Sequence, residues 1–228
     1  DIEVKTPVNE TIAKKIMAAG DKLIAKADAL IIEDYNKGAL TPAVCQHLIK
    51  TANKHGVPVL VDPAAIEDYS KYTGATTITP NSTEACLATG LKQSQADAMA
   101  RKLMRDLKLQ TVVLTLDKSG ALLLEKGKKP IAVPTEARSV YDVTGAGDMV
   151  ISMLAATLAN GADWPMAVNL SNVAAGLEVE KFGVVPIELD EILVALLQKQ
   201  HQELGKIRTL DQLLPEVNAY RKQGKSIA

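Results

Sequence analysis

A glycine-rich stretch that ends in an acid carries the clearest chemical signal of the sequence. The run Tyr141-Asp142-Val143-Thr144-Gly145-Ala146-Gly147-Asp148 leads directly into an apolar segment over 149–159. Two glycines permit a tight turn, and the free N–H groups and dipole of a helix start favour a bound anion. An aspartate beside that anion would repel it, but could take a proton from a hydroxyl group that attacks a phosphate. The stretch therefore predicts either a phosphoryl-transfer site with Asp148 as the base, or a plain helix start with a first-turn acid.

A second polar pattern, Asn81-Ser82-Thr83-Glu84, is also open to two interpretations. Asn81 can cap a helix, with Glu84 completing a capping box. Alternatively, both side chains lie near Mg²⁺, a hard cation that keeps most of its waters and takes few protein ligands. The pattern alone does not decide between a helix cap and a magnesium site.

The elements that would position these residues follow from the hydrophobic pattern. Short apolar segments over 29–32, 57–61, 76–79 and 111–116 predict buried strands, and helical patterns over 7–26, 41–55, 82–89 and 94–108 alternate with them. Ser94 is the expected cap of the last of these helices. Further strands are expected over 121–125 and 130–133 as an antiparallel pair, and further helices over 146–160, 164–181, 188–203 and 209–223. This alternation predicts an α/β protein with a mostly parallel sheet covered by helices on both sides.

Polar residues stand at or just after several of the predicted strand ends. Ligands of such sheets bind beyond the carboxyl ends of the strands. Asp34, Asp62, Asn81 and Thr115 are therefore expected to converge on one edge of the sheet. Thr115 and Gly120 bracket a turn that either approaches a nucleotide closely or is plain turn chemistry.

Composition and missing motifs exclude several classes of function. The 228 residues carry a formal net charge of −1, which gives no support to binding of nucleic acid or of a membrane surface. No apolar stretch reaches the roughly 18 residues of a membrane span. A Gly-x4-Gly-Lys-Ser/Thr motif is absent, and Val150 stands where a dinucleotide-binding loop has its third glycine. Cys45 and Cys86 lack metal-ligand spacing and fit a reducing, cytoplasmic location.

Both motifs together resemble one family. Residues 142–148 resemble the D-x-T-G-A-G-D signature of the ribokinase-like (PfkB) carbohydrate kinases, and Asn81-x-x-Glu84 resembles a second motif of that family. Segments 33–40, 57–63 and 140–143 resemble the members that phosphorylate D-glycero-β-D-manno-heptose 7-phosphate at O1. In those members the kinase is one domain of the bifunctional enzyme of ADP-heptose synthesis. That synthesis serves the assembly of the lipopolysaccharide core. The resemblance extends from about residue 12 to residue 197.

The resemblance implies a ribokinase-like three-layer α/β/α fold. It implies a kinase domain over 1–204, and a linker and helix over 205–228 that lead toward a nucleotidyltransferase domain outside this chain. It also implies that the amino-terminal part of the family fold, with its β lid, is missing here. Two departures from the heptose kinases are Ala64 in place of a lysine after Asp-Pro, and Asp117 in place of a glycine common in the wider family.

Residue roles also follow from the resemblance. Asp148 is the implied catalytic base, and the amides of Gly145, Ala146 and Gly147 are the implied anion hole. The implied contacts to ATP and Mg²⁺ are Asn81, Glu84, Thr115, Gly120, Thr144 and Asn172, with Glu84 and Asp142 as candidate metal ligands and Asp34 and Lys37 as candidates for the sugar phosphate.

The implied cofactors are ATP and Mg²⁺, with a monovalent cation left open. The implied partners are a sugar phosphate, and a second copy in a homodimer of the intact enzyme, without nucleic acid or membrane. Two other functions stay open at this point. One is another ribokinase-like sugar kinase, and the other is a truncated nucleotide-binding module without turnover.

Overall fold

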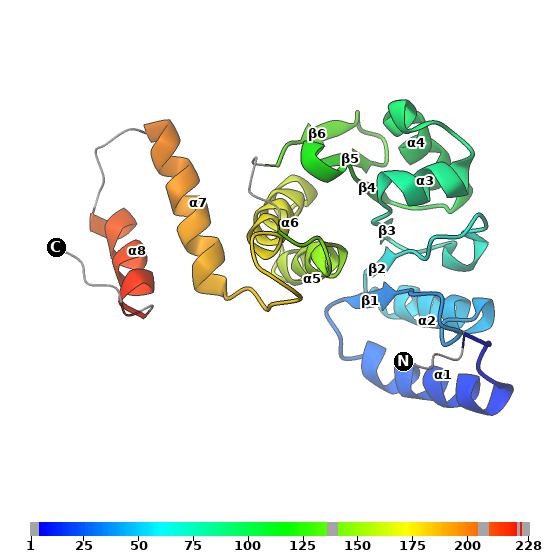
Figure 1. Ribbon diagram of the computed structural model, residues 1–228. Coiled ribbons are helices and arrows are strands. Elements are labelled where there is room, and N and C mark those ends of the chain that lie inside the picture. The colour runs from blue at the N-terminus through cyan, green and yellow to red at the C-terminus, as the bar shows by residue number, and fades with distance from the viewer. Residues whose placement is uncertain (1–4, 136–140, 205–209, 223, 225–228) are drawn as a thin grey trace.

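A computed structural model describes residues 5–135, 141–204, 210–222 and 224 (Figure 1). Its sheet has the strand order β1-β2-β3-β4-β5-β6. Strands β1 (Leu30–Glu33), β2 (Val59–Asp62), β3 (Thr77–Ile78) and β4 (Thr111–Thr115) are parallel. Strands β5 (Ala121–Glu125) and β6 (Ile131–Val133) are antiparallel to their neighbours. The mostly parallel sheet and its antiparallel pair are confirmed.

Helices cover both faces of the sheet. Successive residues of a strand point to opposite faces, so neighbouring residues of β2 pack against different helices. Val59 and Val61 of β2 join the apolar cluster under α2 (Pro42–His55), α3 (Ser82–Thr89) and α4 (Ala96–Asp106). Leu60, between them, joins the cluster under α5 (Ala146–Ala159) and α6 (Trp164–Glu178). Helix α1 (Glu10–Ile24) packs on the outside of α2. The predicted three-layer α/β/α arrangement is confirmed.

Local chemistry fixes most helix ends. The Thr41 side chain caps α2, whose first residue is Pro42, and Gly56 ends it with a φ of 72° in the left-handed region. The expected cap at Ser94 is wrong. A 3₁₀ turn over Gln93–Gln95, closed by a hydrogen bond from Lys92 N to Gln95 Oε1 (3.1 Å), delays the start of α4.

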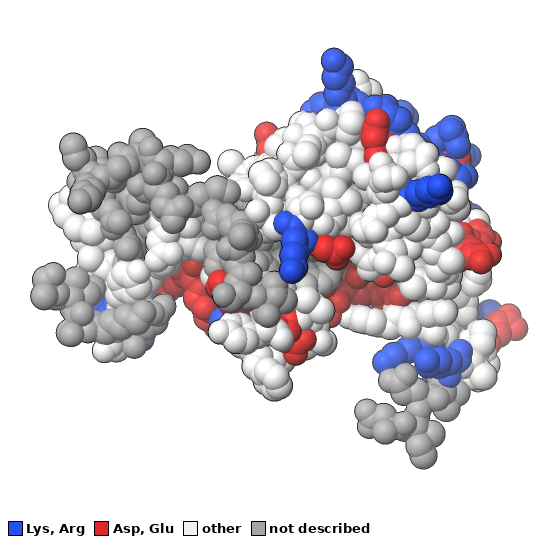
Figure 2. Space-filling model, turned by 45° about the horizontal axis from the view of Figure 1, so that its top comes forward, with Lys and Arg blue, Asp and Glu red and all other residues white. Residues whose placement is uncertain are grey.

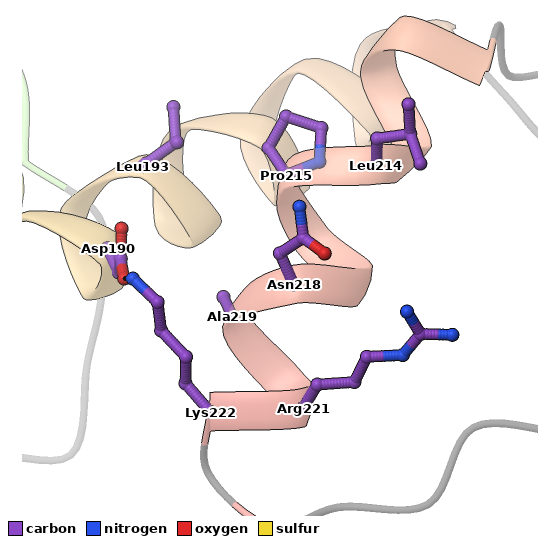
Figure 3. Close-up of a pocket in the computed structure, with 8 residues that line it drawn as sticks. All are labelled: Asp190, Leu193, Leu214, Pro215, Asn218, Ala219, Arg221 and Lys222. Carbon is purple, nitrogen blue, oxygen red and sulfur yellow. Dashed lines mark hydrogen bonds and ion pairs between the residues drawn. The ribbon is translucent and has the colours of Figure 1, made fainter.

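The last two helices form a pair beside the three layers (Figure 1). Helix α7 (Leu189–Leu204) packs against α6, and α8 (Leu210–Lys222) packs against α7. A pocket of about 610 Å³ lies between them. Figure 3 shows residues that line it, among them Lys222, which forms an ion pair with Asp190. The domain boundary after residue 204 stays a prediction, because residues 205–209 lie outside the described part. No helix in the described ranges is long and apolar enough to cross a membrane.

One edge of the sheet collects the chain segments that matter for chemistry. The carboxyl ends of β1 to β4 lie there, at Glu33, Asp62, Ile78 and Thr115. Because β5 runs the other way, its first residue Ala121 pairs with Thr115, and the last residue of β6, Val133, pairs with Ala121. This edge is called the site edge below.

Candidate active site

The glycine loop is built by the carboxylate of Asp142. Its Oδ1 accepts a hydrogen bond from Thr144 N (2.9 Å), and its Oδ2 accepts one from Gly183 N (3.3 Å). These bonds, that from Thr144 first, lower the pKa of Asp142. A further bond from Tyr141 N to Val179 O (2.8 Å) ties the loop to the end of α6. Asp142 therefore shapes the loop, and its role as a metal ligand stays a prediction.

Gly145 begins α5 in a conformation that suits only glycine. Its φ is 92°, and a Cβ at this position would lie 2.5 Å from Oε1 of Glu178. The N–H groups of Gly145, Gly147 and Asp148 donate to no other residue in the described part, whereas Ala146 N donates weakly to Val143 O at 3.3 Å. The start of α5 thus presents free N–H donors, the arrangement that binds an anion at a helix start.

Asp148, in the first turn of α5, faces the end of β1. Tyr35 donates its hydroxyl to Asp148 Oδ1 at 2.7 Å. Burial raises the pKa of Glu33 at the end of β1, and the charge of Asp148 raises it further. The pKa of Glu178 is raised by burial, and then by Asp148 and Asp142. Carboxylates are therefore grouped around the start of α5. Figure 2 shows acidic side chains gathered in the middle of one face of the molecule.

Asp62 lies directly beneath the loop. Its Oδ2 is 3.5 Å from where a Cβ on Gly147 would lie, and its Oδ1 accepts a hydrogen bond from Thr79 (3.0 Å). Burial raises the pKa of Asp62 to about 7, with a smaller contribution from Glu84, Asp148 and Glu33, and the Thr79 hydroxyl opposes the rise. A side chain on Gly147 would meet Asp62 in ordinary contact, so the loop rests closely on β2.

Asn81 and Glu84 form the capping box that starts α3. Glu84 N donates to Asn81 Oδ1 (3.0 Å), and Asn81 N donates to Glu84 Oε2 (2.8 Å). The capping interpretation is therefore confirmed, which does not exclude a second role for Glu84. Asn81 also forms a parallel bridge with Thr115, so the two predicted nucleotide contacts are neighbours at the site edge.

The residues at the site edge fit Mg²⁺ held partly through phosphates and water. No group of three His, Cys, Asp or Glu side chains in the described ranges could hold a metal ion alone. Mg²⁺ commonly takes only one or two carboxylates and completes its shell with substrate phosphates and waters. Burial raises the pKa of Glu84, although the hydrogen bonds from Asn81 oppose this, and a nearby cation would favour its charged form.

Gly120 and Asn172 hold the segment that follows β6. Gly120 has a φ of 86°, and a Cβ there would overlap Val133 O. Asn172 Nδ2, from α6, donates to the same oxygen at 3.0 Å. Their structural role is to hold the end of β6 at the site edge, and their contact with a nucleotide stays a prediction.

Asp34 is more deeply placed than its position after a strand suggests. It is 8% exposed, and its Oδ2 accepts from the Tyr72 hydroxyl (2.8 Å) and from Lys71 Nζ (2.5 Å). It can be buried because a cation and a hydroxyl group satisfy its carboxylate. Lys37, in contrast, is exposed, with Nζ 6.0 Å from the ring centre of Tyr35. Whether either residue contacts a sugar phosphate stays a prediction.

The two departures from the family pattern have visible surroundings. Ala64 is buried, and its N–H donates to the Tyr72 hydroxyl at 3.0 Å. Asp117 begins the 3₁₀ turn Asp117–Ser119 with a φ of 48°, in the left-handed region that glycine adopts most easily. The glycine common in the wider family therefore has a backbone reason, and aspartate tolerates the same conformation.

Sequence reasoning did not assign Tyr35, Glu33 and Glu178 to the site. The position of Asp62 after a strand predicted that it lies at the site edge, but not that it contacts the glycine loop. Tyr35 is 113 residues from Asp148, so no local spacing connects the two. Glu178 lies inside a predicted helix, and nothing in that helical pattern indicates a role in the site.

Comparisons with known proteins agree with this geometry. A family model described as pfkB family carbohydrate kinase matches residues 2–190. The chain is 42% identical to "Bifunctional protein HldE" of Stutzerimonas stutzeri over 91% of its own length and 43% of the relative. It is 36% identical to the protein of that name in Desulfatibacillum aliphaticivorans, over 100% of its own length and 47% of the relative. The chain therefore spans about half the length of these curated relatives.

Solved structures show the same fold at lower identity. Phosphofructokinase-2 from Escherichia coli in complex with potassium superposes with a TM-score of 0.72 at 20% identity, over 88% of this chain and 64% of that one. Ribokinase of Arabidopsis thaliana complexed with ribose and ATP gives a TM-score of 0.66 at 21% identity, over 83% of this chain and 60% of that one.

Proposed function

Because the chain belongs to the pfkB family of carbohydrate kinases, we propose that it transfers the γ-phosphoryl group of ATP to O1 of D-glycero-β-D-manno-heptose 7-phosphate. The free N–H donors at the start of α5, with the carboxylate of Asp148 in the same first turn, are the observation that carries this proposal. An anion site and a proton acceptor side by side suit transfer of a phosphoryl group to a hydroxyl. The resemblance of segments 33–40, 57–63 and 140–143 to the heptose kinases supports a heptose phosphate as the acceptor, in a pathway that leads to ADP-heptose and lipopolysaccharide.

In this proposal Asp148 accepts the proton of the attacking hydroxyl. The amides of Gly145, Gly147 and Asp148 donate to the oxygens of the transferred group, where negative charge accumulates. Ala146 contributes less than the resemblance implies, because its N–H already has a partner.

The nucleotide lies along the site edge beside Asn81, Thr115, Gly120 and Asn172, with Thr144 near its phosphates. Glu84 is the candidate to hold Mg²⁺ through water, and Asp142 is a weaker one, because two N–H groups already occupy its oxygens. When bound, Mg²⁺ supplies neutralisation of the phosphate charge. Lys37 and Asp34 remain the candidates for the sugar-phosphate side, and a monovalent cation and a homodimer remain part of the proposal for the longer protein.

The deciding experiment compares the wild-type chain with Asp148→Asn. MgATP binding is measured by calorimetry, and transfer of labelled phosphate to heptose 7-phosphate is measured on the same samples. We expect the variant to keep MgATP affinity and to lose turnover by about 10²-fold or more, the usual contribution of a general base. Asp97→Asn, on the remote surface of α4, is the matched control, and should change neither quantity.

The possible results separate three functions. A near-normal kcat for Asp148→Asn would refute the assignment of the base. Faster transfer to ribose or to fructose 6-phosphate than to heptose 7-phosphate would favour another sugar kinase. Binding of MgATP by the wild-type chain without any transfer would favour a nucleotide-binding module.

A further inference from the structure

Within the described part of the chain, Tyr35 makes the one hydrogen bond to the side chain of the proposed base. Its hydroxyl donates to Asp148 Oδ1 at 2.7 Å, joining the loop after β1 to the first turn of α5. A carboxylate at a helix start can turn about its side-chain bonds, and a donor on one oxygen selects one orientation. The contact leaves Oδ2 as the oxygen without a recorded donor in the described residues.

The backbone around Tyr35 is held firmly on both sides. On one side, Asp34 is fixed in the interior by Lys71 and Tyr72. On the other side, Asn36 adopts a φ of 55° and donates its N–H to Asp34 Oδ1 at 2.8 Å. These contacts give both carboxylate oxygens of Asp34 a partner within the fold. Their effect is to hold the neighbouring tyrosine at the site edge.

A second constraint lies three residues further along the loop. Gly38 has a φ of 87°, and a Cβ there would overlap Thr6 O. Val8 N donates to Gly38 O at 3.0 Å, so the segment before α1 packs against this end of the loop. The loop from Asp34 to Gly38 is therefore anchored at both ends, while Tyr35 itself is 59% exposed.

The hydroxyl of Tyr35 is a donor that ordinary pH changes do not remove. Its hydrogen bond to Asp148 raises the pKa of Tyr35 well above its usual value, and burial and the charges of Asp148, Glu33 and Asp62 raise it further. Glu33 and Asp62, two of the acidic groups that act on Tyr35, themselves have raised pKa values, chiefly because they are buried. Tyr35 therefore keeps its proton over the ordinary pH range.

We propose that Tyr35 is a positioning residue for Asp148, whose hydroxyl holds Oδ1 and so leaves Oδ2 to accept the proton of the acceptor hydroxyl. This inference rests on the proposed function, since it assumes that Asp148 is the base. Tyr35 transfers no proton itself. Its hydroxyl increases the fraction of time in which the Asp148 carboxylate is correctly oriented.

Two measurements on the full chain test this role. The first follows the ultraviolet absorbance of tyrosinate against pH in the wild type, Tyr35→Phe and Asp148→Asn, with circular dichroism to verify the fold. The difference between the wild type and Tyr35→Phe isolates the titration of Tyr35. We expect its midpoint to fall by about one pH unit or more in Asp148→Asn, because a charged acceptor has been replaced by a neutral one. An unchanged midpoint would overturn the contact.

The second measurement is steady-state kinetics of transfer to heptose 7-phosphate. Tyr35→Phe keeps the ring and removes the hydroxyl, so we expect kcat to fall about tenfold with the KM for the sugar unchanged, a part of what a general base contributes. Tyr220→Phe is the matched control, since its hydroxyl contacts Gln198 on α7, away from the site edge. An unchanged kcat in Tyr35→Phe, or an equal loss in Tyr220→Phe, would overturn the proposal.

Failure of this inference is distinguishable from failure of the proposed function. A wild-type chain without transfer to any sugar would count against the kinase proposal, and the Tyr35 titration would then test only the contact between Tyr35 and Asp148. A shifted titration with an unchanged kcat would refute positioning and leave the kinase proposal intact.

Discussion

Replacement of Asp62 by asparagine tests whether the site edge lowers the stability of the fold. The carboxyl group lies beneath Gly147 and accepts a hydrogen bond from Thr79. Asparagine has nearly the same shape and keeps an oxygen for that hydroxyl. The substitution therefore removes the charge with little other change.

The magnitude follows from the raised pKa of Asp62, which moves from 3.8 to about 7, chiefly through burial. Between these pH values the folded protein keeps a proton that the unfolded chain has released, so the free energy of unfolding falls as the pH rises from 3.8 to about 7. The interval is about three pH units, each worth about 1.4 kcal/mol, so the charged group costs up to about 4 kcal/mol above neutrality. Asp62→Asn should recover most of this at a pH of about 8, and almost nothing at a pH of about 4.

The assay is urea unfolding followed by the fluorescence of Trp164, the single tryptophan, at several pH values from about 4 to about 8. We expect the difference in unfolding free energy between Asp62→Asn and the wild type to grow steadily with pH. Asp68→Asn is the control, because Asp68 is exposed and hydrogen bonds from Ser70 lower its pKa. Parallel pH profiles for the wild type and Asp62→Asn would refute the reasoning.

Two further substitutions address the anion site and the cation site separately. Glu84→Gln keeps an oxygen that can accept the hydrogen bond from Asn81 N, so the thermal unfolding temperature should change little. Calorimetry should nevertheless show weaker MgATP binding. A matching loss of thermal stability and of MgATP binding would leave Glu84 with only its capping role. Gly145→Ala places a Cβ against Glu178 in a left-handed backbone, and should cost about 1–3 kcal/mol of stability and most MgATP binding. Gly161→Ala, at a left-handed position with open space around it, is its control for backbone strain alone, and equal MgATP binding in both variants would contradict the role of Gly145.

Much of the fold could be predicted, because short sequence patterns indicate most of its helices and strands. The strand over 111–116 is a largely apolar run. Helix α2 can be located from its cap, Thr41, and its first residue, Pro42. Ser94 was misjudged because Gln95, a neighbouring side chain, closes a 3₁₀ turn that competes with the helix start. Such competition depends on geometry that residue types alone do not determine.

The site could be predicted only where residues lie in one short motif. Asp148 and the glycines before it share a stretch of eight residues, so their chemistry is visible in the sequence. Tyr35 reaches that stretch only through the fold of the sheet. Asp34 shows another limit, since its position after a strand predicts that it lies at the edge of the sheet, but not that it is buried against a lysine 37 positions later.

The reversal of the chain at β5 has a consequence for where the catalytic loop can lie. Strand β4 reaches the site edge at Thr115, β5 carries the chain away from it, and β6 returns it at Val133. Two antiparallel strands, an even number, deliver residues 141–148 to the edge that already holds the ends of β1 to β4. An odd number would place the glycine loop at the far end of the sheet, with every local motif intact. The parity of these two strands, and no residue within them, thus decides whether base and anion site meet the rest of the pocket.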